Sequence, residues 1–282
     1  MTTSDELVVR YANHIKDKVI ITTGVSPGSL GAYFVQAVAK AHPAWIILAS
    51  RNLKKAQQTQ EVIAASSPDV KTRIVQLDLE SLQSVRDAAA AVNSWSDIPV
   101  VDVLVNNAGM LAETYGLTVD GIERQFAAIY LGHFYYNFDG GKTYNRLLAY
   151  GQAKTASILM AISLAQKLGQ RGLLSFSLHP GTILTNAAAD LDLEAYVVEL
   201  LGNKEGFVNG SFPEVLTIEQ GTATHVYAAF DPDLSGNNGA YLINCHPADP
   251  LTDAVKPWVT SPFEAEKLWR LSEKLVGQNF SY

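Results

Sequence analysis

The 282 residues carry a formal net charge of −7, and 48% of them are hydrophobic while 17% are charged. This composition supplies enough apolar side chains for a large core, and it lacks the clusters of lysine and arginine typical of nucleic-acid binding. The one cysteine, Cys245, excludes an intramolecular disulfide and a cysteine-based metal cluster. The six histidines show no metal-ligand spacing, so we expect no metal site.

The sequence pattern predicts neither a membrane-spanning segment nor a secretory signal. Residues 1–7 lack the basic and apolar regions of a secretory signal. No apolar run approaches the roughly 18–20 residues that span a bilayer. We therefore expect a cytoplasmic protein that acts on a small molecule.

In the first hundred residues, short apolar runs alternate with longer helical stretches. The expected strands lie at residues 18–23, 45–49, 73–77 and 100–105, and the expected helices at residues 31–41, 53–65 and 82–95. Continuous apolar strands that alternate with helices predict a parallel sheet covered by helices on both faces.

The same alternation continues downstream, with one irregular stretch. Helices are expected at residues 121–136, 148–168 and 264–276, and strands at residues 173–178 and 239–244. Residues 182–213 have weak helical patterning and are interpreted as a lid over a substrate. Because no shift in composition marks a linker, we expect residues 1–282 to form a single domain.

A glycine-rich turn follows the first strand and precedes the first helix. Glycines such as Gly24 and Gly28 let the backbone approach a pyrophosphate, and the helix start offers free N–H groups. Such a turn is by itself weak evidence, because many are simply tight turns. Its place between a strand and a helix favours a dinucleotide site.

The residue that reads the ribose is expected at the end of the second strand. About 20 residues after the glycines the chain has Arg51, preceded by the small Ser50 and with no acidic residue nearby in the sequence. A guanidinium group suits the 2′-phosphate of NADP better than the 2′-hydroxyl of NAD. The alternative is a solvated arginine at a strand end. We predict NADP(H) as the cofactor.

Five motifs then occur in order at the ends of the expected elements. They are residues 24–28 (Gly-Val-Ser-Pro-Gly), 77–79 (Leu-Asp-Leu), 106–109 (Asn-Asn-Ala-Gly), 150–154 (Tyr-Gly-Gln-Ala-Lys) and 180–181 (Pro-Gly). Together they resemble the short-chain dehydrogenase/reductase family, particularly its retinol-dehydrogenase-like branch, from about Lys18 to the end of the chain. The resemblance implies a Rossmann-type doubly wound parallel sheet in three α/β/α layers, and a homodimer or homotetramer through two long helices.

The resemblance also implies which residues contact the cofactor. Asp78 would contact the adenine, Asn106 and Ala108 would lie under the ribose, and Ile183 and Thr185 would hold the nicotinamide amide. The other implied contacts come from Gly24, Ser26, Gly28, Leu30, Arg51, Gly109, Tyr150, Lys154, Pro180 and Gly181. Two residues rather than one separate Gly28 from Gly31, so either the turn is one residue longer or Leu30 takes the last glycine's place.

Tyr150 and Lys154 are the candidate catalytic pair. They are four residues apart on an expected helix and therefore share a face. A phenol has an ordinary pKa near 10, and a cation beside it lowers the pKa toward the range that acid–base catalysis requires. The bland alternative is an ordinary helix surface, but the pair lies between the two motifs that flank it in the family.

Two further parts of the family's catalytic set are not found. Where the resemblance places a catalytic asparagine, this chain has Ile129. The 13 residues 137–149, between the preceding helix and Tyr150, contain adjacent glycines and no β-branched apolar run. The fifth strand, which would carry the catalytic serine, is therefore expected to be absent. Its loss would leave a gap in the sheet or force its neighbours to pair anew.

The sequence thus favours an NADP-dependent oxidoreductase that moves hydride between the nicotinamide and a carbonyl or alcohol. The apolar residues of the lid, such as Leu191 and Tyr196, suggest a lipophilic substrate. The alternative is a nucleotide-binding pseudoenzyme, or a ligand-binding protein or isomerase that reuses the fold. The absent serine and asparagine favour the alternative, and the Tyr150/Lys154 pair opposes it.

Overall fold

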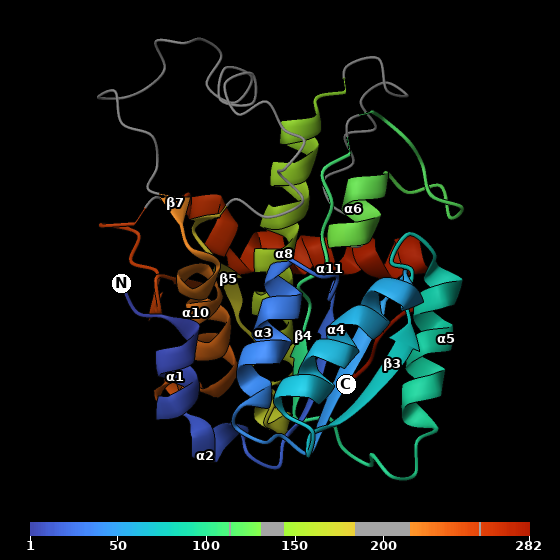
Figure 1. Ribbon diagram of the computed structural model, residues 1–282. Coiled ribbons are helices and arrows are strands. Elements are labelled where there is room, and N and C mark those ends of the chain that lie inside the picture. Colours follow the sequence, from blue (N-terminus) through green and yellow to red (C-terminus); the bar gives the residue numbers. More distant parts are fainter. Residues whose placement is uncertain (113, 131–143, 184–214, 254) are drawn as a thin grey trace.

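The computed structural model describes residues 1–112, 114–130, 144–183, 215–253 and 255–282. Parallel strands form a central layer, and helices cover both of its faces. Figure 1 shows α3 (Leu30–Ala39) and α4 (Leu53–Ser66) in front of the strands and α11 (Pro262–Val276) behind them. This is the three-layer α/β/α architecture that the sequence predicts.

The main sheet has four parallel strands in the order β3-β2-β1-β4. They are β1 (Val19–Thr23), β2 (Trp45–Ser50), β3 (Lys71–Gln76) and β4 (Val103–Val105). Ile20 faces Ile46 on one side and Val103 on the other. The two central strands are almost wholly buried because helices cover both faces, which explains their uninterrupted apolar sequences.

The helices divide into two layers around this sheet. One layer contains α1 (Ser4–Arg10), α3, α4 and α10 (Ile218–Phe230), and the other contains α5 (Leu82–Asn93), α6 (Arg124–Ile129), α8 (Arg146–Leu168) and α11. The helices α1, α10 and the short α2 (Ala12–Ile15) were not predicted from the sequence. Both α1 and α10 begin with a capping box, in which Thr3 and Thr217 bond to the backbone three residues on.

The carboxyl-terminal half of the chain forms two smaller sheets. One joins β5 (Ser177–His179), β8 (Tyr241–Ile243) and β9 (His246–Pro247), and the other joins β6 (Thr182–Ile183) to β7 (Val215–Leu216). Short 3-10 helices lie at residues Gly169–Arg171, Pro232–Asn237 and Pro257–Thr260.

The central layer is interrupted between β4 and β5. Within the described residues β4 pairs only with β1, and β5 pairs only with β8. Both strands are shorter than their apolar sequences predict: β4 covers three of the residues 100–105, and β5 begins only at Ser177. Leu104 in the middle of β4 is 58% exposed. The interruption lies where the sequence predicts a lost strand; that a whole strand is missing from the chain stays a prediction.

The helix expected at residues 121–136 begins later than predicted and is interrupted at Tyr130, while its predicted end at residue 136 lies outside the described residues. Gly121 has φ +75°, and the described helix α6 begins only at Arg124, where Glu123 accepts hydrogen bonds from the N–H groups of Gln125 and Phe126. Tyr130 is extended, so α6 ends at Ile129. Residues 131–143 lie outside the described residues, as does most of the expected lid (184–214).

One helix contradicts the expectation that no segment could span a bilayer. Residues 146–171, which are α8 and the turn after it, are long and apolar enough to cross a membrane by length and composition. The core helix of a globular protein passes the same test, and α8 packs against α6 and α11. The segment is therefore weak evidence for a membrane span.

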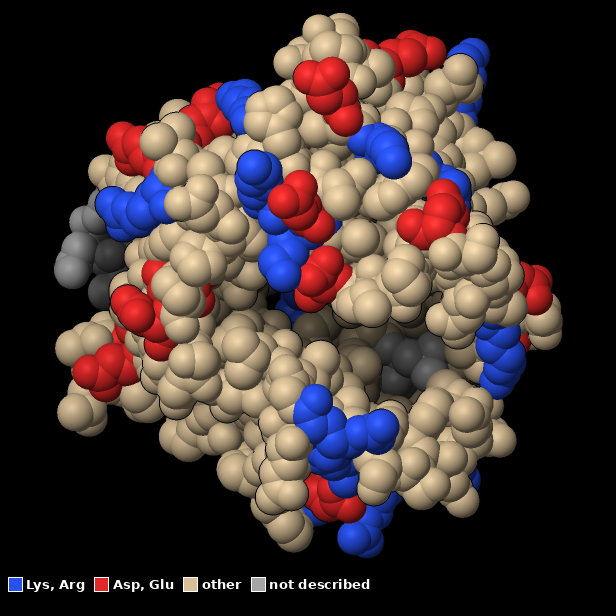
Figure 2. Space-filling model, turned by 90° about the horizontal axis from the view of Figure 1, so that it is seen from below, with Lys and Arg blue, Asp and Glu red and all other residues tan. Residues whose placement is uncertain are grey.

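The face at which the parallel strands begin is hollowed (Figure 2). Basic side chains (lysine and arginine, blue) and acidic side chains (aspartate and glutamate, red) are interspersed over this face and do not form separate patches. Asp102, just before β4, bonds to the N–H of Val19 at 2.8 Å and to Lys18 Nζ at 2.9 Å. These two bonds tie the start of β4 to the start of β1.

Candidate functional site

The glycine-rich turn between β1 and α3 is held by a side chain from the end of β4. Asn107 Nδ2 donates to the carbonyl oxygens of Thr23 at 2.9 Å and Gly24 at 3.1 Å. The N–H of Ala108 donates to Thr23 Oγ1 at 2.9 Å, and the N–H of Gly24 donates to the Ala49 carbonyl at 3.2 Å. The turn therefore lies where β1, β2 and β4 end, which is the binding edge of an open α/β sheet.

Glycine is required at two positions of this turn. Gly24 has φ +70°, and a Cβ there would lie 2.7 Å from Ala108 Cα. A Cβ on Gly31 would lie 2.4 Å from Asn107 Nδ2 and 2.7 Å from the Gly24 carbonyl oxygen. Leu30 is the first residue of α3. Of the two alternatives, the structure thus has the longer turn, with Gly31 in the crowded position.

The start of α3 presents the free N–H groups that an anion needs. Ser29 caps the helix: its Oγ accepts from the N–H of Ala32 at 3.1 Å and donates to the Gly24 carbonyl at 2.9 Å. On the other side of the turn, the buried Thr59 Oγ1 of α4 donates to the Val25 carbonyl at 2.7 Å. These bonds fix the loop at the start of α3, a position at which backbone N–H groups can bind an anion.

Arg51 lies directly after β2, as expected, but it is not isolated from acidic groups. Its Nη1 pairs with Glu80 Oε2, and Glu80 Oε1 pairs with Arg124 Nε. The two guanidinium groups, that of Arg124 first, hold the pKa of Glu80 below its ordinary value. The expectation of an arginine without an acid nearby is therefore wrong in space, although it is right along the sequence.

Lys154 approaches the end of β4 from α8. A Cβ on Gly109 would lie 3.5 Å from Lys154 Nζ and 3.7 Å from Ile129 Cγ1, so both side chains meet the Gly109 backbone. Nζ lies 5.4 Å from the centroid of the Tyr150 ring, and burial lowers the pKa of Lys154. Nζ has no hydrogen bond or ion pair with any other residue that the structure describes. A half-buried cation of this kind favours a polar partner.

Ile129 lies at the position that the sequence analysis assigned to a lost asparagine. It is the last residue of α6, and its carbonyl oxygen accepts from Ser157 Oγ of α8 at 3.5 Å. Its aliphatic side chain faces the Gly109 backbone beside Lys154. It offers neither a donor nor an acceptor there, so this wall of the site is apolar.

The Pro-Gly turn after β5 borders the site from the other sheet. Gly181 has φ +85°, and a Cβ there would lie 2.4 Å from Leu216 Cδ1. A Cβ on Gly221 would lie 1.9 Å from Ile183 Cδ1, so α10 comes close enough only because Gly221 has no side chain. His179 Nδ1 accepts from the N–H of Gly181 at 3.0 Å, and burial and the Lys154 charge lower the pKa of His179.

The sequence of this chain matches a known family in the region that contains this turn. Residues 18–136 match the family model described as short chain dehydrogenase. The chain is 31% identical to short-chain dehydrogenase TIC 32 B of Brassica napus over 300 residues, which cover 91% of this chain and 88% of that protein. The chain belongs to the short-chain dehydrogenase/reductase family. Short-chain dehydrogenase/reductase prx1 of Penicillium rubens is also 31% identical, over 93% of this chain and 86% of that protein.

Solved structures of an oxidoreductase and a reductase share the fold. A putative D-mannonate oxidoreductase from Haemophilus influenza with bound NAD has a TM-score of 0.61 and 19% identity, and covers 83% of this chain and 96% of its own. A reductase named YwfH, described as NADPH dependent, has a TM-score of 0.59 and 17% identity. The match covers 85% of this chain and 100% of that reductase. At these identities the likeness establishes the architecture alone.

The structure brings most of the expected site residues of this short-chain dehydrogenase to one edge. Grouped there are the glycine turn, Arg51 and the ends of β4 and β5, together with the start of α8. Asp78 Oδ1 accepts from the N–H of Glu80 at 3.0 Å, which shapes the turn that carries Glu80. Thr185 lies outside the described residues. The following expected residues lie in the turn from β1 into α3, after the ends of β2, β3, β4 or β5, in β6, or in the first half of α8: Gly24, Ser26, Gly28, Leu30, Arg51, Asp78, Asn106, Ala108, Gly109, Tyr150, Lys154, Pro180, Gly181 and Ile183.

Three residues shape the site beyond those expected to contact the cofactor: Asn107 and Glu80 were missed from the sequence, and Gly31 was one of two alternatives left open. Asn107 fastens the turn, Gly31 makes the close approach, and Glu80 pairs with Arg51. Asn107 could have been noticed as the second asparagine of the 106–109 motif. No local pattern distinguishes Glu80, because its partners come from two other segments of the chain.

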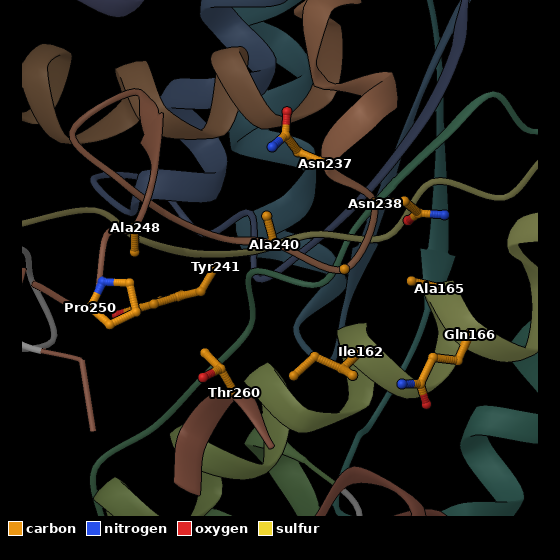
Figure 3. Close-up of a pocket in the computed structure, with 11 residues that line it drawn as sticks. Ile162, Ala165, Gln166, Asn237, Asn238, Ala240, Tyr241, Ala248, Pro250 and Thr260 are labelled. Atoms are coloured by element: carbon orange, nitrogen blue, oxygen red, sulfur yellow. The ribbon is translucent and has the colours of Figure 1, made fainter. Parts of the chain in front are cut away.

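A cavity of about 480 Å³ lies away from this edge (Figure 3). It is lined by Ile162 and Gln166 of α8, by Asn237 at the end of a 3-10 helix and by Tyr241 at the start of β8. Along α8, Ile162 is 12 positions after Tyr150 (162 − 150), or about 18 Å at 1.5 Å per residue. The cavity is therefore not part of the candidate active site.

Proposed function

We propose that this protein is an NADP-dependent oxidoreductase that interconverts a carbonyl compound and an alcohol. The observation that carries the proposal is Lys154, a half-buried side chain whose ammonium lies beside Gly109 and the Tyr150 ring and has no hydrogen-bond partner among the described residues. The hydroxyl groups of a nicotinamide ribose would satisfy it. Gly24 and Gly31 support the same reading, because their lack of side chains lets the turn pack closely against Asn107 and Ala108 at the end of β4, where an open α/β sheet binds its ligand.

Each residue then has a distinct part in the reaction. The nicotinamide, when bound, supplies or accepts the hydride. Tyr150 would donate the proton to the carbonyl oxygen during reduction and take it back during oxidation. The Lys154 charge favours the phenolate form of Tyr150 and orients the ribose. Arg51 would contact the 2′-phosphate of NADP(H). The residues that suggest a lipophilic substrate, at 184–201, lie outside the described residues.

Single-turnover hydride transfer from bound NADPH to a panel of aldehydes and ketones tests the proposal. We expect Tyr150→Phe to abolish transfer while NADPH binding persists, because the change removes only the oxygen that carries the proton. Tyr241→Phe, in β8 beside the distant cavity, is the matched control and should transfer hydride at the native rate. Native-like transfer by Tyr150→Phe would show that another acid does this work.

A second candidate, a nucleotide-binding protein with little catalytic power, is favoured by Ile129 and by the interruption between β4 and β5. A preorganised donor to a developing oxyanion is commonly worth 10²–10³ in rate. We therefore expect slow transfer, and at least a 100-fold gain when a β-strand ending in serine is restored before Tyr150. Rates that agree within about threefold, with NADPH bound in both proteins, would rule out a catalytic role for the restored strand. NADPH binding without measurable transfer in either protein would favour the second candidate.

A further inference from the structure

Three charged residues from separate segments form one cluster beside the glycine turn. Arg51 follows β2, Glu80 lies between β3 and α5, and Arg124 begins α6. Each carboxylate oxygen of Glu80 takes one guanidinium: Oε2 pairs with Arg51 and Oε1 with Arg124. The two arginines therefore share a single counter-charge, and the cluster has a net charge of about +1.

The three side chains of the cluster differ in their exposure to solvent. The side chain of Glu80 is 14% exposed, that of Arg124 39%, and that of Arg51 61%. The guanidinium groups hold the pKa of Glu80 low, so this carboxylate is ionised at neutral pH. Arg124 contributes the largest part of that effect and is itself anchored by its N–H, which donates to the Gly116 carbonyl at 3.1 Å. Arg51 is the more solvated partner and the one that a ligand can recruit.

The place of the cluster makes it relevant to a nucleotide. Ser50 pairs in register with Gln76, so Arg51 and the turn that holds Glu80 leave adjacent strands at the same edge. The N–H of Gly24, in the glycine turn, donates to the carbonyl oxygen of Ala49, which lies two residues before Arg51. A guanidinium binds a phosphate well, whereas a carboxylate accepts hydrogen bonds from ribose hydroxyls and repels a phosphate. The chain presents both groups at this one position.

We propose that Glu80 sets the preference between nucleotides with and without a 2′-phosphate, and that Arg124 tunes it by drawing Glu80 away from Arg51. The inference rests on the proposed nucleotide-binding function. Glu80 competes with a 2′-phosphate for Arg51 and repels that phosphate, so it weakens NADP(H) relative to NAD(H). Arg124 neutralises part of the Glu80 charge and so restores part of the affinity for the phosphate.

Calorimetric titration of the full chain with 2′,5′-ADP and with 5′-ADP tests this without any turnover. Glu80→Gln should tighten 2′,5′-ADP by roughly two- to fivefold, the range of a partly exposed charge pair, and leave 5′-ADP almost unchanged. Arg124→Gln should weaken 2′,5′-ADP by roughly twofold or more, because Glu80 then turns its full charge toward Arg51.

Asp97→Asn is the matched control. It also removes one carboxylate paired with an arginine, because Asp97 Oδ2 bonds to Arg73 Nη2 at 2.8 Å, but that pair lies near the opposite end of β3. It changes the net charge by the same amount and should leave the ratio of the two affinities unaltered. Thermal unfolding of each variant checks that its fold is intact.

The outcomes separate the inference from the function on which it rests. If neither nucleotide binds the native chain, the proposed function fails and this inference fails with it. If both nucleotides bind and Glu80→Gln leaves the affinity ratio within about 1.5-fold of the native value, the inference alone is overturned. A similar change of the ratio in Asp97→Asn would also overturn it, because the effect would then come from net charge.

Discussion

The side-chain amide of Asn107 lies against the backbone of Gly24, to whose carbonyl oxygen its Nδ2 donates at 3.1 Å. A second bond, to Thr23, makes this amide the link between the end of β4 and the glycine turn. The turn and the strand that carries Gly109 are thereby held as one unit. Loss of the amide should release the turn from β4, and with it the geometry of the whole binding edge.

Asn107→Ala should lower the free energy of unfolding by about 1–3 kcal/mol, because two backbone acceptors lose their donor. It should also weaken 5′-ADP severalfold. Asn238→Ala is the matched control: Asn238 also makes two backbone bonds, to Leu173 and Ser175 at 2.8 Å, but far from the turn. Chemical denaturation and calorimetry measure both effects. Equal loss of 5′-ADP affinity in the two variants would contradict the role given to Asn107.

Gly31→Ala should destabilise the protein by about 1–3 kcal/mol or more, because the new methyl group meets the Gly24 carbonyl at 2.7 Å and the Asn107 amide at 2.4 Å. Gly151→Ala should instead increase the stability of the protein. Gly151 lies in α8 with no atom within 4 Å of a Cβ, so alanine stabilises the helix by about 0.5–1 kcal/mol. Thermal denaturation compares them. A neutral Gly31→Ala would show that Leu30, and not Gly31, occupies the crowded position.

Arg51→Ala should weaken binding of NADPH and leave NADH almost untouched. An unpaired arginine would predict a loss of about 1.5–3 kcal/mol. Because Arg51 is 61% exposed and already pairs with Glu80, we expect the lower end of that range or less. Fluorescence titration with the two cofactors measures the difference. Equal losses for NADPH and NADH would mean that Arg51 does not read the 2′-phosphate.

His225 should make the protein less stable in mild acid. Burial lowers the pKa of His225 to about 4, from an ordinary value near 6.5. As the pH falls from about 6.5 to 4, His225 is protonated in the unfolded chain but stays neutral in the folded chain. The free energy of unfolding therefore decreases by up to about 1.4 kcal/mol per pH unit. Burial also penalises a positive charge at His179, and the nearby Lys154 charge acts in the same direction on both histidines.

His225→Leu should therefore flatten the pH dependence of stability between pH 4 and 6.5, whatever its effect on stability at pH 7. The acidic groups that lose ion pairs in this range are unchanged by the substitution, so the difference in slope isolates His225. Replacement of the exposed His14 by glutamine is the control and should leave the slope unaltered. Parallel curves for the native protein and His225→Leu would show that His225 takes up no proton on unfolding.

The local pattern of the chain was enough to predict much of the parallel core. β1 and β2 are continuous apolar runs, and α3, α4 and α8 have capping residues and helical spacing close to the observed bounds. Tyr150 and Lys154 share a face because four residues make about one helical turn. These features depend on neighbours in the sequence, so a sequence reading can find them. The helices α1 and α10 were missed because each lacks a clear link to a motif, although both carry capping boxes.

Residue type and spacing by themselves determined that this chain forms a parallel α/β sheet with a glycine turn and a tyrosine–lysine pair at its edge. Only the tertiary structure decided what surrounds them. Glu80 is 29 residues from Arg51 and 44 from Arg124, yet it pairs with both. The break between β4 and β5 likewise depends on which strand edges meet. Partners that the fold brings together from distant segments leave no periodic trace in the sequence, since each segment is patterned by its own burial and not by the charge it will face.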